Sequence, residues 1–176
     1  MIPIPYGRGT LAWQWPYDGL LTSRLDTLKS EKTGLSLVEA ALEHPIGSPS
    51  LPALAAGKKT CTIIISDHTR PVPSRDILPP VLRQLRQGNP DIQVTLLVAT
   101  GFHRLTTTAE LEAKLGPEIA RRERIVVHNA FDPDSNVRIG TLPSGAPLVI
   151  DRLAVETELL IAEGFIEPHF FAGFSG

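Results

Sequence analysis

The sequence has a single cysteine, Cys61, so no disulfide can form within one copy of the chain. It also lacks the basic start and apolar stretch of a secretory signal. No apolar run approaches the roughly 20 residues that span a bilayer. These absences exclude a disulfide-rich secreted scaffold and a transmembrane protein, and they predict a cytoplasmic protein without a membrane partner.

The sequence also has no large excess of positively or negatively charged residues. The chain carries 17 Lys and Arg against 19 Asp and Glu, which gives a net charge of -2 at pH 7. Proteins that bind nucleic acid neutralise phosphates with clustered basic residues, and no such cluster is present. We therefore expect no nucleic-acid partner.

The composition is that of a globular domain. Hydrophobic residues make up 42% of the chain and charged residues 20%, which is too apolar for a disordered protein. A length of 176 residues suits one ordinary domain. The prediction is a single domain over residues 1–176.

Short apolar runs alternate with helical spacing along most of the chain. The spacing predicts helices over 36–43, 74–87 and 108–115, and strands over 61–65, 92–98 and 124–128. Thr107 and Glu110 fit a capping box before the third helix. Pro79 and Pro80 interrupt the second pattern, so its regular helix is expected to begin near them.

The remaining segments predict less regular structure. Residues 1–5 and 10–15 should be extended, followed by a polar connection to Gly34, and residues 45–52 should form a loop. The runs 137–142 and 147–150 predict a hairpin, and 157–162 is a last short apolar run. The stretch 164–176 has too little pattern for a regular element and too many aromatic residues for a solvated tail.

The alternation of strands and helices gives the fold class. Continuous apolar strands are typical of a parallel sheet that is covered on both faces. We expect an α/β fold with a mostly parallel, Rossmann-like layered sheet, helices on both faces and a β-hairpin.

Ionisable residues follow three of the predicted strands directly. In open parallel sheets, ligands bind where the loops leave the carboxyl ends of the strands. The candidate residues in those loops are Asp67, His68, Thr69 and Arg70 after the first strand, His103 after the second, and His169 after the last run.

Asp67 and Arg70 allow two interpretations. Arg70 could offer its planar guanidinium to a carboxylate or phosphate, with Asp67 orienting it. Alternatively, Asp67 caps the turn that follows and Arg70 pairs with it at the surface.

His103 and His169 are the acid/base candidates, because an imidazole can take and give protons near neutral pH. The alternative for any histidine is a hydrogen-bonded structural role, which we assign to His44 and His128, while His68 stays undecided. Two histidines with Asp67 could also form a facial metal site. No H-x-H or H-E-x-x-H pair supports that reading, so no residue is assigned as a metal ligand.

Three stretches together resemble the lactate racemase family in order and spacing. They are Asp67-His68-Thr69-Arg70-Pro71, Thr100-Gly101-Phe102-His103-Arg104, and the glycine- and aromatic-rich run from Gly164 to Gly176. The resemblance covers most of the chain from about Thr60 onward, and the third stretch is the most specific.

The resemblance implies a racemase or epimerase of 2-hydroxy acids that uses a nickel-pincer nucleotide and hydride transfer. By position, His103 and His169 would be the two acid/base residues, one for each enantiomer. Asp67, His68, Thr69 and Arg70 would contact the cofactor, and Arg70 would also hold the substrate carboxylate. In the family the third stretch continues to a cofactor lysine, which these 176 residues do not contain.

We therefore expect an N-terminal part whose cofactor loop, 164–176, is cut off before the cofactor lysine. Without that lysine these residues should neither hold the cofactor nor be active alone, and the C-terminal half of the same protein is the missing partner. Two other functions stay open. One is an α/β module that binds an anionic small molecule without catalysis, and the other is a cofactor-free two-base racemase.

Overall fold

The computed structural model describes residues 1–16, 18–19 and 31–175. The chain divides into two compact units, residues 1–31 and residues 32–176. In the first unit, β1 (Ile2–Tyr6) and β2 (Gly9–Trp13) form an antiparallel hairpin with Tyr6 opposite Gly9. Both segments are extended as predicted. The predicted polar connection to Gly34 lies largely outside the described residues.

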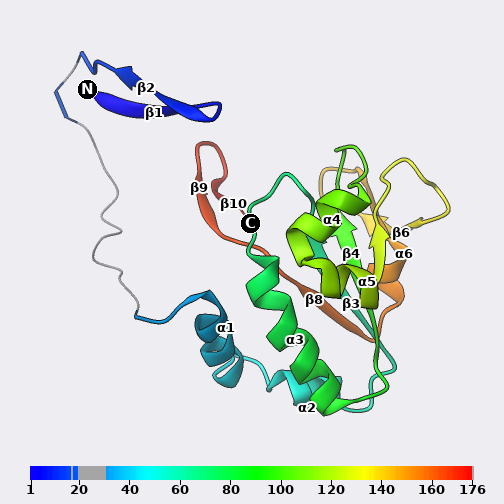
Figure 1. The fold of residues 1–176 in the computed structure, drawn as a ribbon. Coiled ribbons are helices and arrows are strands. Elements are labelled where there is room, and N and C mark those ends of the chain that lie inside the picture. The colour runs from blue at the N-terminus through cyan, green and yellow to red at the C-terminus, as the bar shows by residue number, and fades with distance from the viewer. Residues whose placement is uncertain (17, 20–30, 176) are drawn as a thin grey trace. The chain divides into compact units, whose positions relative to one another are not determined.

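A four-stranded parallel sheet organises the second unit (Figure 1). Its strands are β3 (Thr60–Ser66), β4 (Gln93–Ala99), β5 (Arg124–Val127) and β8 (Leu159–Ala162). Their order is β5-β4-β3-β8, so β3 and β4 are central and β5 and β8 are the edges among the described residues. This arrangement confirms the predicted α/β fold with a parallel sheet.

One face of the sheet carries the main core. Alternate side chains of β3 and β4 are buried there against α3 (Ser74–Gly88), because successive residues of a strand point to opposite faces. Helices α2 (Leu51–Ala55) and α4 (Thr108–Leu115) close the ends of this layer. The best buried members are Ile63, Ile65, Leu78, Leu85, Leu96 and Val98.

The other face is covered by α6 (Arg152–Glu156) and by the hairpin of β6 (Asn136–Thr141) and β7 (Pro147–Asp151). Thr62 of β3 donates a hydrogen bond from Oγ1 to the Leu153 carbonyl at 3.1 Å. Helices therefore lie on both faces, and the hairpin is where the sequence predicts it. Coverage of both faces explains why the strands are continuously apolar.

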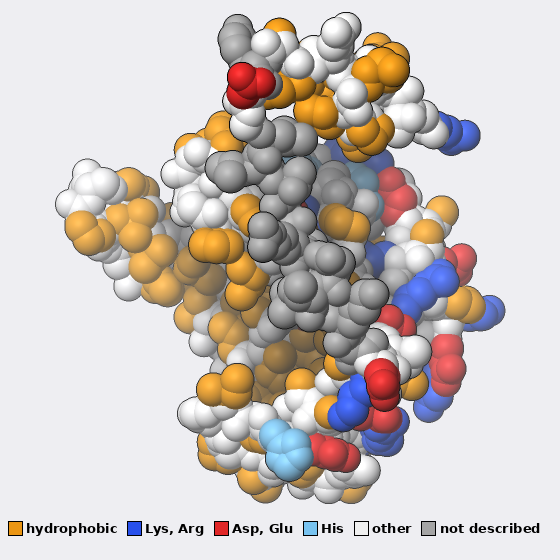
Figure 2. Space-filling view, turned by 90° about the vertical axis from the view of Figure 1, so that its left-hand side faces the viewer, with side chains coloured by type: hydrophobic (Ala, Val, Ile, Leu, Met, Phe, Trp, Pro, Cys, Tyr) orange, Lys and Arg blue, Asp and Glu red, His pale blue; other side chains and the backbone are white. Residues whose placement is uncertain are grey.

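Two further helices complete the unit. Helix α1 (Gly34–Glu43) lies beside α3 and confirms the helix predicted over 36–43, while α5 (Pro117–Arg122) follows α4. The capping box is confirmed, since Thr107 and Glu110 satisfy each other's backbone N–H groups. On the face shown in Figure 2, basic and acidic side chains are interspersed. Arg83 of α3 and Glu39 of α1 form an ion pair at 2.7 Å.

The prediction that the second helix begins near its two prolines is wrong. Helix α3 begins at Ser74, and Pro79 and Pro80 lie inside it. The N–H groups of Asp76 and Ile77 both donate hydrogen bonds to the Pro73 carbonyl. The first turn of the helix therefore forms without any hydrogen bond from Pro79 or Pro80. Only the carbonyls of two early residues lose a helical partner, and Pro80 gains a fully buried position in the core.

The expectation that 164–176 holds no regular element is also wrong. Strands β9 (Glu167–His169) and β10 (Gly173–Ser175) pair antiparallel across a three-residue turn. Gly173 has a φ of 79°, a conformation that glycine adopts without strain. Three short helices, α2, α5 and α6, were not predicted, and α2 takes the last residues of the loop expected at 45–52. Its Pro52 lies in the first turn, where a missing N–H is harmless.

Among the described residues, no helix has the length and apolar character required to traverse a lipid bilayer.

Gly88 provides a test of the packing between α2 and α3. A Cβ at this position would overlap the backbone of Pro52, including its carbonyl oxygen, so Gly88→Ala must force the two helices apart. We expect it to lower the free energy of unfolding by about 1–3 kcal/mol in urea denaturation, even though alanine favours helix. The control is Gly140→Ala, where a Cβ meets no atom within 4 Å. Equal stability of the two variants would contradict this packing.

Candidate functional site

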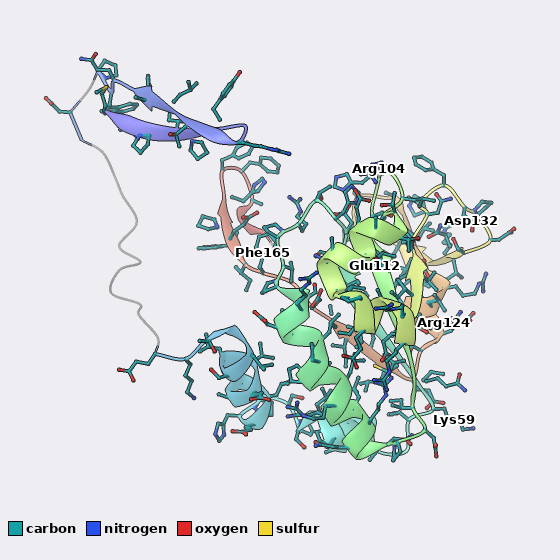
Figure 3. All side chains as sticks on the ribbon, viewed as in Figure 1. Lys59, Arg104, Glu112, Arg124, Asp132 and Phe165 are labelled. Carbon is teal, nitrogen blue, oxygen red and sulfur yellow. The ribbon has the colours of Figure 1, made fainter. Side chains whose placement is uncertain are left out.

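The carboxyl ends of three strands meet at one edge of the sheet. Ser66 at the end of β3 pairs with Ala99 at the end of β4, and Ala162 at the end of β8 pairs with Ile64. Figure 3 shows Arg104 and Phe165 toward this edge, and Lys59, which precedes β3, at the opposite one. The three predicted loops therefore start side by side.

Asp67 and His103 form a hydrogen-bonded pair across two of these loops. His103 Nδ1 lies 2.6 Å from Asp67 Oδ2, although 36 residues separate them. The other carboxylate oxygen, Oδ1, accepts from the Thr69 hydroxyl at 2.6 Å and from the Thr69 N–H at 3.0 Å. Asp67 is only 2% exposed, whereas the His103 side chain is 51% exposed.

The charge of Asp67 determines how His103 carries its proton. Burial by itself raises the pKa of Asp67, but the hydrogen bonds from Thr69 and His103 outweigh it and hold the pKa below its usual value. An ionised carboxylate can only accept hydrogen bonds, so Nδ1 of His103 is the protonated nitrogen. Nε2 of a neutral His103 then has a free lone pair, as a base requires.

His169 is held in a different way. It ends β9, and its Nδ1 accepts from the backbone N–H groups of Phe171 at 3.4 Å and Ala172 at 3.3 Å. Its ring stacks on Phe170 with a centroid distance of 4.8 Å. Because Nδ1 accepts, a neutral His169 carries its proton on Nε2 and is set to donate from that nitrogen.

Arg70 is the exposed cation of the first loop. Its backbone N–H reaches the Asp67 carbonyl at 3.4 Å, but its guanidinium makes no hydrogen bond or ion pair with any described residue. The turn-capping alternative is thus correct for Asp67, which binds the Thr69 N–H. The predicted surface pair between Asp67 and Arg70 is absent among the described residues, so Arg70 is available to an anion.

His68 and Thr69 occupy the rest of that loop. His68 Nδ1 lies 3.1 Å from Thr106 Oγ1 and 3.9 Å from Glu110 Oε2, and its side chain is mostly buried. Arg104 binds both oxygens of Glu110 and, with hydrogen bonds from Thr107, keeps the pKa of that carboxyl well below its usual range. This network fixes the loop that leads from β4 to α4.

A cavity of about 490 Å³ opens between the ends of β3, β4 and β8. Arg70 and His169 line it together, over a floor formed by Ile64, Ala99 and Ala162. His103 belongs to the neighbouring loop and is not in its lining. The structure thus joins His103 to Asp67 and His169 to the cavity of Arg70, but brings the two histidines into no direct contact. Their catalytic roles stay predictions.

The described residues contain no group of three or more His, Cys, Asp or Glu side chains that could hold a metal ion. His128, to which we assign a structural role, lies on the other face of the sheet. Its Nδ1 is hydrogen-bonded to Oδ2 of Asp151, the last residue of β7, at 2.9 Å.

Two polar residues of the cavity were missed from the sequence. Ser66 is the last residue of β3, and Glu163 follows β8 directly. Glu163 stands after its strand just as Asp67 stands after β3, so the same positional rule could have found it. The pairing of Asp67 with His103 has no local sequence pattern.

Comparison with known proteins places these features in context. Residues 6–176 match the family model described as lactate racemase N-terminal domain. The chain is 51% identical to the lactate racemase of Thermoanaerobacterium thermosaccharolyticum and 49% identical to that of Lactiplantibacillus plantarum. Each match covers 99% of this chain but only 42% of the relative.

Solved structures agree with this match. The lactate racemase apoprotein from T. thermosaccharolyticum superposes with a TM-score of 0.89 at 50% identity, over 99% of this chain and 41% of that one. A Thermotoga maritima protein shares the fold with a TM-score of 0.61 at 22% identity, over 82% of this chain and 36% of that one.

The pKa of Asp67 predicts a dependence of stability on pH. Because its folded pKa is below the unfolded value of about 3.9, the carboxylate stabilises the fold above that pH and loses its contribution as the pH falls. We expect Asp67→Asn to lower the free energy of unfolding by about 1–3 kcal/mol at pH 7, and by less below about pH 4. Urea titrations at several pH values measure this difference.

The exposed Asp91 at the opposite edge of the sheet offers the control, Asp91→Asn, whose effect should be small at every pH. If Asp67→Asn lowered the free energy of unfolding equally at every pH, Asp67 would stabilise the fold through its shape and not through its charge.

Proposed function

The chain belongs to the lactate racemase N-terminal domain family, and from this membership we propose that it forms the N-terminal part of a racemase or epimerase of 2-hydroxy acids. It spans about two fifths of the length of the curated relatives. We propose that residues 1–176 act as the domain that carries both catalytic histidines. A C-terminal part of the same protein would complete the site, in the cytoplasm.

The strand order supports two-sided chemistry. β3 lies between β4 and β8, so the loop that carries Arg70 has His103 on one side and His169 on the other. A racemase must serve both faces of a planar intermediate, which one base on one side cannot do. This flanking of an unpaired arginine by two histidines is the observation that carries the proposal.

Each histidine would handle a proton at Nε2. For the enantiomer whose hydroxyl faces His103, Nε2 would accept the hydroxyl proton while Asp67 stabilises the imidazolium through Nδ1. Nε2 of His169 would return the proton on the other side. Arg70 would hold the substrate carboxylate through its guanidinium in the cavity that it shares with His169.

The residues of this edge fit an anionic cofactor with a planar ring. Arg70 has no partner among the described side chains, and the floor of the cavity is apolar. In a nickel-pincer nucleotide, whose own atoms carry the metal, the bound group would supply the acceptor and donor of the hydride. Asp67, His68, Thr69 and Arg70 would position it, with 164–176 as the second wall.

The buried position of Asp67 refines this assignment. Both of its oxygens are already engaged by Thr69 and His103, so its effect on cofactor or substrate would pass through His103. Thr69 and Arg70 are the exposed members of the loop and would make the direct contacts.

Substitution of either histidine tests the proposal. In the full-length protein, expressed with the enzymes that make the cofactor, His103→Asn and His169→Asn should each lower interconversion of D- and L-lactate about 10²- to 10⁴-fold. Optical rotation or chiral chromatography measures the rate. His44→Asn, at an exposed helix end, is the control and should retain activity. Normal rates in both site variants would exclude the two-base role and favour a binding module.

The fate of the α-hydrogen separates the proposed hydride transfer from a cofactor-free racemase. When the reaction runs in D₂O, hydride transfer keeps the original hydrogen on the α-carbon, whereas proton abstraction by a histidine exchanges it with solvent. We expect the racemised lactate to contain no deuterium at this carbon by mass spectrometry. Full incorporation would establish the cofactor-free mechanism instead.

A further inference from the structure

Thr69 is joined by two hydrogen bonds to the buried partner of His103. Its hydroxyl donates to Asp67 Oδ1 at 2.6 Å, and its backbone N–H donates to the same oxygen at 3.0 Å. The other oxygen, Oδ2, lies 2.6 Å from His103 Nδ1. Asp67 is only 2% exposed, so protein groups rather than solvent orient its carboxylate.

The two bonds from Thr69 have different requirements. The N–H bond is a turn that an aspartate makes with the backbone two residues later, and any residue except proline could donate it. The hydroxyl bond requires a serine or threonine at position 69. Hydrogen bonds to an ionised carboxylate are short and about twice as strong as those between neutral groups. The hydroxyl is therefore what the side chain of Thr69 adds to this contact.

The hydroxyl also limits the charge that Asp67 presents to His103. Burial raises the pKa of Asp67, and among the groups that lower it the Thr69 hydroxyl has the largest effect. A donor at Oδ1 stabilises negative charge on that oxygen and leaves less of it on Oδ2. Charge on Oδ2 stabilises an imidazolium, so the Thr69 hydroxyl makes His103 easier to deprotonate. A base must be neutral when it accepts a proton.

Other charged side chains surround the same pair. Arg104, from the loop after β4, and Lys114 of α4 both interact with the charge of the buried carboxylate. Arg104 is itself paired with Glu110, and His68 faces Glu110 as well. A change in the Thr69 side chain alters none of these groups, so their effects are common to all the variants below.

We propose that Thr69 is a positioning residue for proton transfer at His103. Its hydroxyl holds the Asp67 carboxylate with Oδ2 toward the imidazole and moderates how strongly that carboxylate stabilises the imidazolium. The inference rests on the proposed function, which makes His103 a base. Because the hydroxyl proton is donated to Asp67, the Thr69 oxygen can only accept a hydrogen bond from a bound cofactor.

The test is a ¹³C NMR titration of His103 in the full-length protein, labelled at the histidine Cε1 carbons and free of cofactor. The His103 signal is the one that His103→Asn lacks. Thr69→Val keeps the shape and the N–H of the residue but loses the hydroxyl, and its exposed position should accept valine without repacking. The midpoint of the titration should then rise by about 0.3–1 pH unit. Thr69→Ser, which restores the hydroxyl, should return it to the wild-type value.

Two further variants fix the sign and the specificity of this shift. Asp67→Asn should move the His103 midpoint downward, because an amide carries no charge that stabilises the imidazolium. Thr62→Val is the matched control, since it removes another hydroxyl bond, to the Leu153 carbonyl on the other face of the sheet. It should lower stability without moving the midpoint. Urea unfolding verifies that each variant is folded.

The cofactor-loaded enzyme gives a second measurement. Two-base racemisation needs one histidine neutral and the other protonated, so kcat/KM should have a bell-shaped pH profile. Thr69→Val should move one limb of this profile to higher pH, and Thr69→Ser should restore it. Enantiomers have the same free energy, so both directions of the reaction must show the same change. A merely structural defect would lower the whole profile and move neither limb.

The role of Thr69 is overturned if Thr69→Val titrates His103 like wild type, or if Thr69→Ser moves the midpoint as far as Thr69→Val does. Neither outcome depends on racemisation. A midpoint that moves as expected, combined with fully active histidine variants, would retain the link between Thr69 and His103 and reject the two-base mechanism. An unchanged midpoint with inactive histidine variants would reject only the role of Thr69.

Discussion

Parallel pairing of β3 with both β4 and β8 is the constraint on which the site depends. Parallel strands end at the same edge, so residues that are about 100 positions apart in the chain leave the sheet next to one another. The apolar core beneath β3 and β4 fixes the register of this pairing, because a shift by one residue would expose the side chains that α3 covers. Core packing and site geometry therefore have the same origin.

Much of this arrangement could be predicted from local patterns. The strands, the capping box of α4, the hairpin and the edge where ionisable residues gather all follow from spacing and from residue type. The prolines in α3 show the limit of such patterns, since the penalty for a missing N–H is offset by burial of Pro80, which depends on the whole core. The β9–β10 pair was equally hidden, because three-residue strands carry too little periodicity to be detected.

In the candidate site, too, single residues could be predicted from the sequence, whereas the contacts between them could not. His103, His169 and Arg70 were identified as candidates because each follows a strand. The hydrogen bond between Asp67 and His103 could not be predicted, because it joins two loops whose separation depends on the register of β3 and β4. The result is a chemical asymmetry between the two histidines. One ring is backed by a buried carboxylate and the other by backbone N–H groups, so the two imidazoles begin from different proton distributions.

The position of β8 at the edge of the sheet has a consequence for the behaviour of the chain in solution. Among the described residues β8 pairs only with β3, and its other side presents backbone donors and acceptors beside the half-exposed Leu160. An exposed edge of this kind is a template for strand addition. Phe170, Phe171 and Phe174, which are also exposed, add apolar surface close by in sequence. The elements that line the cavity of Arg70 and His169 are thus also the ones whose open strand edge and exposed apolar side chains favour association between copies of this chain.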